Sequence, residues 1–413
     1  MFYNAAGLLG LDTLSPPSTP LIVTTGSLYI YPIPMIFACT QENLAQGLAL
    51  VGHISGKNIN LPILSHVLLK VEEGNLKLSA TNLEMAVSAL VRGRAEATGE
   101  CAVPAKLFQD YVGLLPSGKV ELVLEGDVLE IRADGKVTKI KGMPATEFPL
   151  IPKLAKEGGY SVKATVLRES INEAVFAVSS SDARPELSGV ACFFRASERG
   201  NVCVMAATDS YRLAERTIGV EPVSGTFVET KCIVPSRAMQ EMARILSAYK
   251  DDVGMPEEAQ WMLADNQMVF TYGKVELVSR LIEGSFPDYQ QIIPQSFRTT
   301  FHVSRSELVK AVRAASLFSR QGLFDVHLDL KESGELLVSS SDTGTGAHTT
   351  TLHVEGAESQ TNSVTLNYKY VTDGLAVCPQ DAVTVKMIDA MNPIVFTPKE
   401  GDGFQYIVMP IRQ

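Results

Sequence analysis

The 413-residue sequence has few cysteines, and none of them is placed as a metal ligand or as part of a disulfide framework. There is no CxxC pair and no cluster of histidines beside a cysteine, so neither a zinc site nor a secreted disulfide scaffold is indicated. We expect reduced cysteines that act as small apolar residues in a cytoplasmic protein. The six cysteines are Cys39, Cys101, Cys192, Cys203, Cys232 and Cys378.

Basic residues are fewer than acidic ones, with 36 Lys and Arg against 46 Asp and Glu, which gives a net charge of −10. Phosphate groups are neutralised by cations, so this balance argues against nucleic-acid binding unless the basic residues gather on one surface. An uninterrupted apolar run of about 20 residues, which a membrane span requires, is missing as well, and we expect no membrane partner. The composition is typical of a globular protein long enough for two to four domains.

Residues 1–34 contain no Lys or Arg and therefore lack the basic region of a secretory signal. They are rich in Pro and Ser around residues 15–18 and turn apolar from Leu21 to Pro34. We expect either a flexible N-terminal extension or a start codon placed too early, with the fold beginning near Met35. A packing or partner-binding role for this segment is the alternative.

What the sequence does contain is a threefold internal repeat, which has to be recognised before any motif is interpreted. A turn glycine, an alternating strand and a hydroxyl residue followed by Asn or Asp occur at residues 74–82, 200–209 and 334–342. A short strand running into an amphipathic helix, with Pro or Asn at the helix start, follows at residues 102–108, 233–239 and 365–371. An earlier helix is predicted in each unit, over Thr40–Ile54, Arg168–Ser179 and Ser304–Phe318. The third of these opens with a capping-box spacing.

Proline-rich strings at residues 143–152 and 282–294 are typical of interdomain connectors. They divide the chain into domains at 35–153, 154–295 and 296–413. Each domain holds two helices among many short strands, so the predicted fold class is α+β. The repeat is too long for a solenoid, and each unit is large enough to be a domain.

A cation recurs at one repeat position in the second helix of every unit, as Lys106, Arg237 and Lys369. Carboxylates on the same helices, such as Asp110, Glu241 and Asp373, keep this face only mildly basic. A surface of this kind suits loose contact with phosphates and no reading of bases. The candidate DNA-facing residues are Lys57, Lys106, Arg168, Arg184, Arg237, Lys310, Arg313, Arg320 and Lys369.

Four strings in order along this repeat resemble the β subunit sliding clamp of bacterial DNA polymerase III. They are Leu61–Leu64 (LPIL), Thr208–Ala214 (TDSYRLA), Phe286–Tyr289 (FPDY) and Val408–Arg412 (VMPIR), and the resemblance covers Met35 to Arg412. It implies a head-to-tail homodimer of six domains that closes into a ring, with helices lining the pore and antiparallel sheets outside. Such a ring encircles double-stranded DNA without sequence preference and tethers the replicative polymerase at high effective concentration.

The resemblance also implies a pocket on the second and third domains for short linear peptides of the polymerase, the clamp loader and other proteins that carry a clamp-binding motif. Its expected wall consists of Leu187, Thr208, Ser210, Tyr211, Arg212, Leu213, Pro287, Gln291, Ile292, Leu323, Asn367, Tyr370, Met391, Pro393, Ile407, Val408, Met409, Pro410, Ile411 and Arg412. Arg212 and Asn367 are candidates to hold the peptide backbone. The expected dimer edge consists of Thr138, Ile140, Leu317 and Phe318.

Four residues, at three places in the chain, depart from the family pattern. Ser210-Tyr211 replaces a familiar Gly-His, Gln291 replaces a basic residue, and Thr138 replaces an aromatic. The first two bear on pocket shape and peptide preference, and the third bears on the stability of the ring.

An enzyme and a peptide-binding scaffold are the two alternatives to a clamp. An enzyme is poorly supported, because HExxH, GxSxG and a complete Walker A loop are missing; Lys119 is not followed by Ser or Thr. Asp209 beside Arg212 is the best catalytic pair, but Asn82 and Asp342 at the same repeat position favour a structural role. A β-rich scaffold that binds peptides without encircling DNA is the second alternative. No residue pattern implies a cofactor.

Overall fold

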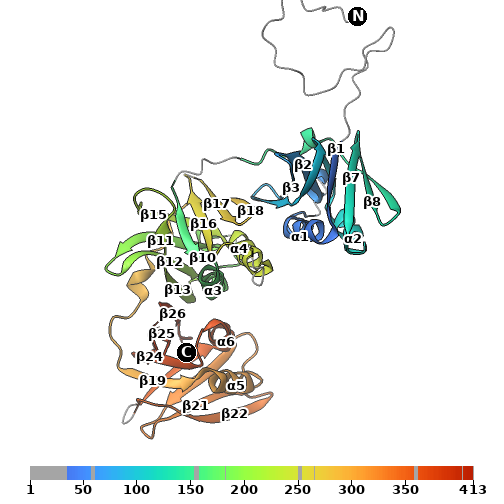
Figure 1. The fold of residues 1–413 in the computed structure, drawn as a ribbon. Helices are drawn as coiled ribbons and strands as arrows, with labels where there is room; N and C mark the ends of the chain where they lie inside the picture. Colours follow the sequence, from blue (N-terminus) through green and yellow to red (C-terminus); the bar gives the residue numbers. More distant parts are fainter. Residues whose placement is uncertain are drawn as a thin grey trace, which may run out of the picture. The chain divides into compact units, whose positions relative to one another are not determined.

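The computed structural model describes residues 35–56, 61–152, 158–181, 183–249, 254–264, 266–357, 361–401 and 403–412. The expected extension at 1–34 and Lys57 lie outside these residues. The described chain falls into two compact units, one formed by the segments up to Ala80 and Leu90–Pro149, the other by Thr81–Ala89 and the chain from Leu150 onward. It contains six α-helices and antiparallel sheets (Figure 1), as the α+β prediction requires.

In the first unit, strands β5-β1-β7-β8-β9 form one antiparallel sheet, and β3-β2-β6 are hydrogen-bonded neighbours. Strands such as β2 bury every second residue, because successive side chains point to opposite faces. The elements are β1 (Met35–Thr40), α1 (Gln41–Gly52), β2 (His66–Glu72), β3 (Asn75–Thr81), β5 (Gly93–Ala97), β6 (Gly99–Pro104), α2 (Ala105–Gly113), β7 (Lys119–Glu125), β8 (Val128–Ala133) and β9 (Lys136–Lys141).

The middle part of the chain opens the second unit. Here β14-β10-β16-β17-β18-β4 are successive neighbours in one sheet, and β15-β11-β12-β13 begin another. The elements are β4 (Met85–Val91), β10 (Tyr160–Lys163), α3 (Ala164–Val175), β11 (Gly189–Ser197), β12 (Gly200–Thr208), β13 (Arg212–Gly219), β14 (Glu221–Pro222), β15 (Thr230–Pro235), α4 (Ser236–Ala248), β16 (Glu258–Leu263), β17 (Gln267–Tyr272) and β18 (Val275–Arg280).

The last part of the chain completes that second sheet, because β26 pairs with β13 and extends it through β25, β24 and β19 to eight strands. A four-stranded sheet, β22-β21-β20-β23, accompanies it. The elements are β19 (Thr299–Ser304), α5 (Arg305–Ser316), β20 (Asp325–Leu330), β21 (Glu335–Asp342), β22 (Gly346–His353), β23 (Asn362–Asn367), α6 (Tyr368–Val377), β24 (Ala382–Met387), β25 (Ile394–Pro398) and β26 (Phe404–Val408).

Helix starts follow the signals in the sequence, with one exception. Ser304 accepts a hydrogen bond from the Glu307 backbone N–H (3.3 Å), and Asn367 accepts one from Lys369 N–H (2.9 Å), as helix N-caps do. Pro104 and Pro235 precede α2 and α4. The exception is α3, which begins at Ala164 instead of the predicted Arg168. Its first turn contains the β-branched Thr165 and Val166, which weaken the helical signal.

The repeated Asn or Asp has the same structural task three times over. Asn82 Oδ1 accepts hydrogen bonds from the backbone N–H groups of residues 84 and 85, Asp209 Oδ1 from those of 211 and 212, and Asp342 Oδ1 from those of 344 and 345. Side chains of this type stabilise turns by replacing a backbone acceptor. The position therefore closes the turn after each repeat strand, which confirms the structural interpretation of Asp209.

All six cysteines are free, and five of them are buried. Burial raises the pKa of the Cys39 and Cys101 thiols to about 12, so these thiols stay protonated and pack as apolar groups. Within the described residues, no helix is both long and apolar enough to cross a membrane.

Candidate functional site

The ends of three strands meet where the middle and last parts of the chain join. Arg212 at the start of β13 pairs with Val408 at the end of β26, and Val408 also pairs with Ile394 at the start of β25. The Met409 backbone N–H donates to the Tyr211 carbonyl over 2.9 Å. The sheet register therefore brings together chain segments around 211, 393 and 409, which are distant in sequence.

Large apolar side chains are exposed in this region, although such side chains are usually buried. Tyr211 is 63% exposed, Met391 56% and Leu323 45%. Beneath the surface, Leu213 and Ile407 are buried in one apolar cluster. Others of the predicted wall residues are buried too, namely Leu187, Thr208 and Val408. The predicted wall thus contains both exposed apolar side chains and buried ones.

Arg212 is occupied by intramolecular contacts. Its guanidinium donates to Asp209 Oδ2 (3.0 Å), to Asp373 Oδ2 (2.7 Å) and to the Phe176 carbonyl (3.0 Å). It also lies over the Tyr370 ring, 4.7 Å from the centroid, and its side chain is only 12% exposed. The guanidinium thus links β13 to α3 and α6, and its predicted role of holding a peptide backbone stays a prediction.

The segment 281–298, called the connector below, crosses the sheet next to this region and contains the short turn Tyr289–Ile292. Tyr289 packs in the same apolar cluster as Leu213 and Ile407 and donates its hydroxyl to a Glu215 carboxylate oxygen. Burial, reinforced by the negative charge of Glu215, raises the pKa of Tyr289 above its ordinary value. This anchor ties the connector, which includes Pro287 and Ile292, to β13. The Gln291 side-chain amide donates a hydrogen bond to Asp288 Oδ2 within the connector (2.8 Å).

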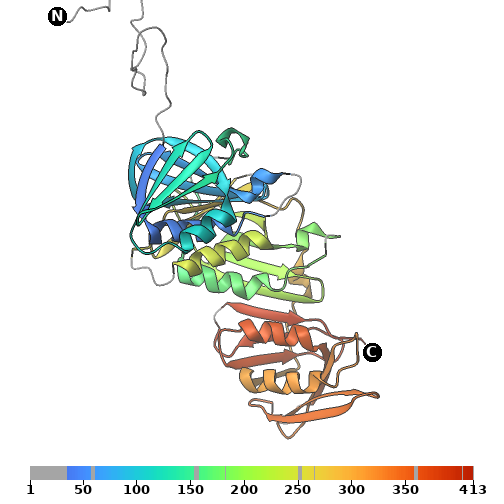
Figure 2. The ribbon, with the colours of Figure 1, turned by 90° about the vertical axis from the view of Figure 1, so that its right-hand side faces the viewer.

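The recurring cations occupy equivalent places in the folded chain. Lys106, Arg237 and Lys369 are each the second residue of their helix, α2, α4 and α6, and each is exposed. Lys106 forms an exposed ion pair with Asp110 over 3.0 Å, and the Lys369 ammonium lies 3.5 Å from the centroid of the Phe324 ring. In Figure 2 the helices of the second unit, α3 with α4 and α5 with α6, run side by side in pairs.

The other predicted DNA-facing cations divide into two groups. Lys310 and Arg313 are exposed on α5. Three arginines are engaged elsewhere: Arg168 has a 14% exposed side chain next to Glu169, Arg184 pairs with Glu186 and donates to Ser210, and Arg320 binds Asp325 over 2.6 Å. These three arginines thus form local ion pairs, and their contact with DNA stays a prediction.

Three family models match consecutive parts of the chain and together span most of it. They describe the N-terminal domain of the DNA polymerase III beta subunit at residues 35–152, its central domain at 161–288 and its C-terminal domain at 290–412. The chain belongs to the DNA polymerase III beta subunit family. Its function is that of a beta sliding clamp, the non-catalytic processivity factor of DNA polymerase III.

Full-length relatives agree with this assignment. The chain is 27% identical to the beta sliding clamp of Synechocystis over 92% of its own length and 99% of the relative. Among solved structures, a sliding clamp of Pseudomonas aeruginosa bound to griselimycin matches with 25% identity and a TM-score of 0.84. The DNA polymerase III beta subunit of Thermotoga maritima matches with 26% identity and a TM-score of 0.82. Both cover 92% of this chain and 100% of their own.

The residues predicted for the edge of the clamp dimer differ in exposure. Leu317 is 76% exposed and Phe318 is half-buried, with its ring stacked on His348 at 5.8 Å. Ile140, on the edge strand β9, is only 3% exposed and packs inside the first unit, and its place at the dimer edge stays a prediction. Thr138 donates its hydroxyl to the Tyr111 hydroxyl over 2.7 Å, which places an aromatic ring beside the position where the family pattern has one.

Sequence reasoning missed the two partners that hold Arg212 of this clamp. Phe176 and Asp373 lie 36 and 161 residues away along the chain. Asp209 is close to Arg212 in sequence and was predicted as its partner. Asp373 was predicted only to reduce the positive charge of the helix face. A buried arginine that has one local carboxylate and still has donors left over is the signal that could have prompted the search.

Proposed function

We propose that two copies of this chain close head-to-tail into a ring around double-stranded DNA, with the six helices of each copy facing the pore. The observation that carries this proposal is the cation at the second position of α2, α4 and α6. A helix N-terminus has a partial positive charge, so a cation there costs about 0.3–1 kcal/mol of helix stability. An unfavourable feature that occurs three times in register requires a compensating function, and contact with phosphates supplies one.

The topological experiment separates a ring from a surface binder. The clamp is assembled on nicked circular plasmid, and its retention in gel filtration is measured before and after a restriction enzyme linearises the DNA. Loss of the protein on linearisation is expected, because a ring slides off a free end. Equal retention on both forms would favour the scaffold that does not encircle DNA.

We also propose that the exposed apolar side chains at the strand ends bind short linear peptides of the replicative polymerase, the clamp loader and other clamp-binding proteins. Exposed Tyr211, Leu323 and Met391 supply apolar contact. Apolar walls with few polar groups are typical of peptide grooves.

This site is tested with Tyr211→Ala combined with Met391→Ala in a primer-extension assay with the cognate polymerase and loader. Both side chains are exposed, so the variant is expected to fold normally and to lose the long products that depend on the clamp. Leu150→Ala, which changes an almost fully exposed leucine near the end of the first domain, is the matched control. Full processivity of the double variant would rule the site out.

The boundaries of the three domains are also part of the proposal. Domains at 35–153, 154–295 and 296–413 agree closely with the matched ranges 35–152, 161–288 and 290–412. The cytoplasm is the location that a partner of chromosomal replication requires.

A further inference from the structure

Three of the six cysteines meet on neighbouring strands of the eight-stranded sheet. Cys192 of β11 is directly opposite Cys232 of β15, the strand at one edge of this sheet. Cys203 lies on β12, the neighbour of β11 on its other side, where it pairs with Phe194. These three cysteines are called the thiol cluster here. The proposed contacts with DNA and with peptides do not involve them.

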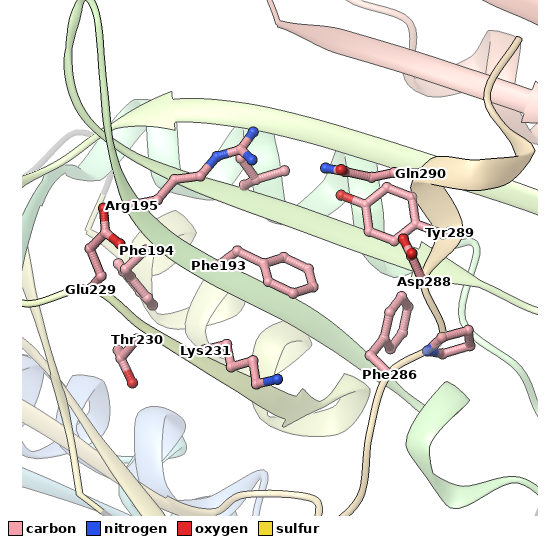
Figure 3. Close-up of a pocket in the computed structure, with 12 residues that line it drawn as sticks. Phe193, Phe194, Arg195, Glu229, Thr230, Lys231, Phe286, Asp288, Tyr289 and Gln290 are labelled. Carbon is pink, nitrogen blue, oxygen red and sulfur yellow. The ribbon is translucent and has the colours of Figure 1, made fainter.

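The side chains of the paired cysteines share one face of the sheet. Figure 3 shows Phe193 and Lys231, the next pair in the same register, side by side on β11 and β15. Since successive side chains alternate between faces, Cys192 and Cys232 project together from the opposite face. Burial, reinforced by the neighbouring Cys203 and Cys232 thiols, raises the pKa of Cys192 well above its ordinary value. The three sulfurs are therefore close neighbours.

Tyr160 of β10 is a second indication that these thiols lie together. Its ring stacks on that of Phe194 with the centroids 3.9 Å apart, and its hydroxyl donates to the Val228 carbonyl. Burial, reinforced by Cys232 and Cys203, raises the pKa of this tyrosine to about 12. The ring thus lies beside both outer members of the thiol cluster.

The strand register distinguishes between the two candidate disulfides of Cys192. Directly opposite residues on antiparallel strands have Cα atoms about 4.5–5.5 Å apart, and diagonal neighbours about 7–8 Å. A disulfide requires a Cα separation of about 4.4–6.8 Å. Cys232 is directly opposite Cys192, whereas Cys203 is diagonal to it, because Met205 is the residue opposite Cys192 on β12. The backbone therefore fits a bond from Cys192 to Cys232 and does not fit one to Cys203.

Access from solvent differs between the two paired thiols. Cys192 is 0% exposed, and its thiol donates a weak hydrogen bond to the Val190 carbonyl over 3.8 Å. Cys232 is half-buried, and it is the one cysteine of the six that is not buried. Because oxidation of cysteine follows exposure, an oxidant in solution reaches Cys232 first.

We propose that Cys192 and Cys232 form a reversible disulfide when the protein meets hydrogen peroxide. The Cys232 sulfur attacks one peroxide oxygen, the O–O bond breaks, and a sulfenic acid forms with release of one water. The Cys192 sulfur then attacks the Cys232 sulfur, the S–O bond breaks, and the departing oxygen takes the Cys192 proton to leave as a second water. Two thiols are oxidised and one peroxide is reduced. A thiol reductant such as glutathione reverses the bond by exchange.

The disulfide ties an edge strand to its neighbour. β15 has β11 as its one strand neighbour in this sheet, and it runs directly into α4, which carries Arg237 at its second position. A bond that closes the loop from 192 to 232 lowers the conformational freedom of the unfolded chain. Oxidation therefore stabilises the strand that positions α4.

The test treats the full chain with hydrogen peroxide, blocks the remaining thiols by alkylation and maps the tryptic peptides by mass spectrometry. Trypsin places the three cysteines of the cluster on separate peptides, because it cleaves after Arg195, Arg199 and Lys231. We expect a linked pair of peptides that carry Cys192 and Cys232, with loss of two of the six thiols. Dithiothreitol should restore all six.

Two variants and a melting curve complete the design. Cys232→Ala should keep its thiols under the same treatment, whereas Cys203→Ala, the matched control from the same cluster, should form the disulfide as the unmodified chain does. The melting temperature of the unmodified chain should rise by about 5 °C on oxidation, and that of Cys232→Ala should not change.

Three results would overturn the proposal. The first is a bond from Cys192 to Cys203, and the second is a bond between two chains on a non-reducing gel. The third is retention of all six thiols at a peroxide concentration that oxidises free glutathione. A chain that carries the Cys192–Cys232 bond and melts at an unchanged temperature would overturn the stabilising effect on β15.

Discussion

Arg212 joins three parts of the second unit through a single side chain. It binds Asp209 at the turn before β13, the Phe176 carbonyl at the end of α3, and Asp373 on α6. Only Asp373 is substantially exposed, so most of these contacts are protected from water. The planar guanidinium fork is what allows one residue to satisfy three acceptors.

Replacing Arg212 with Ala should lower the free energy of unfolding by about 3 kcal/mol, because Asp209 is left buried without its cation. Arg212→Lys should recover only part of this loss, since an ammonium cannot reproduce the fork. Asp373→Asn is the milder comparison, at about 0.5–1 kcal/mol, because that pair is exposed. Urea unfolding midpoints provide the measurement. A lysine variant as stable as the unmodified chain would show that charge alone suffices.

Asp325 makes stability depend on pH. Burial alone would raise its pKa, but hydrogen bonds from Arg320 and Ser319 outweigh this and hold the pKa below its ordinary value of 3.8. A carboxylate with a depressed folded pKa stabilises the protein above the unfolded pKa and loses that contribution as pH falls through the folded value.

We therefore expect the unmodified chain to exceed Asp325→Asn in stability by a constant amount at neutral pH, and the difference to narrow below about pH 4. Urea midpoints of both proteins at pH 7 and pH 3 test this, because the comparison cancels acid effects that the two proteins share. A difference that widens at pH 3 would contradict the assigned sign.

At the scale of elements, the second helix of each domain carries a cation that lowers helix stability and that we propose contacts DNA phosphates. Lys106, Arg237 and Lys369 stand near helix N-termini, where the helix dipole disfavours positive charge. Changing all three to Gln should leave thermal stability equal or slightly higher. The same change should shorten retention on circular DNA and reduce the salt dependence of binding by about one unit of slope per lost phosphate contact. A triple variant that is less stable, with retention unaffected, would assign these cations a structural role.

The elements were also the best-predicted level of the structure. The three repeat strands and the starts of α2, α4 and α6 follow from turn glycines, alternation and Pro or Asn at fixed places. The predicted start of α3 was wrong because the β-branched Thr165 and Val166 are typical of strands. The Arg212 network and the burial of Ile140 were not predictable, since both depend on packing between segments far apart in sequence.

At the scale of the whole molecule, the proposed ring requires that each end of one copy meet the opposite end of its partner. Strands β9 and β22 lie at sheet edges within their own units, and Leu317 is exposed close to Phe318, which contacts β22 through His348. Edge strands with open hydrogen-bonding groups are natural places for pairing with a second chain.

Light scattering should therefore give the mass of a dimer for the full chain and for a version without residues 1–34. Leu317→Lys should shift the mass toward the monomer without lowering the melting temperature, because the side chain is already in water when the chain is alone. Leu150→Lys controls for the added charge. A full chain that stays monomeric at micromolar concentration would leave ring closure dependent on the loader.

The pairing of β13 with β26 also constrains how the protein is made. Gln405 of β26 binds Glu215 of β13, and these residues are 190 positions apart. At a synthesis rate of 5–20 residues per second, roughly 10–40 s pass on the ribosome before β26 emerges. During that interval β13 is an unpaired edge over an incompletely covered apolar cluster. The nascent chain thus has a defined period in which it needs protection from aggregation, and that period ends only when its last domain is translated.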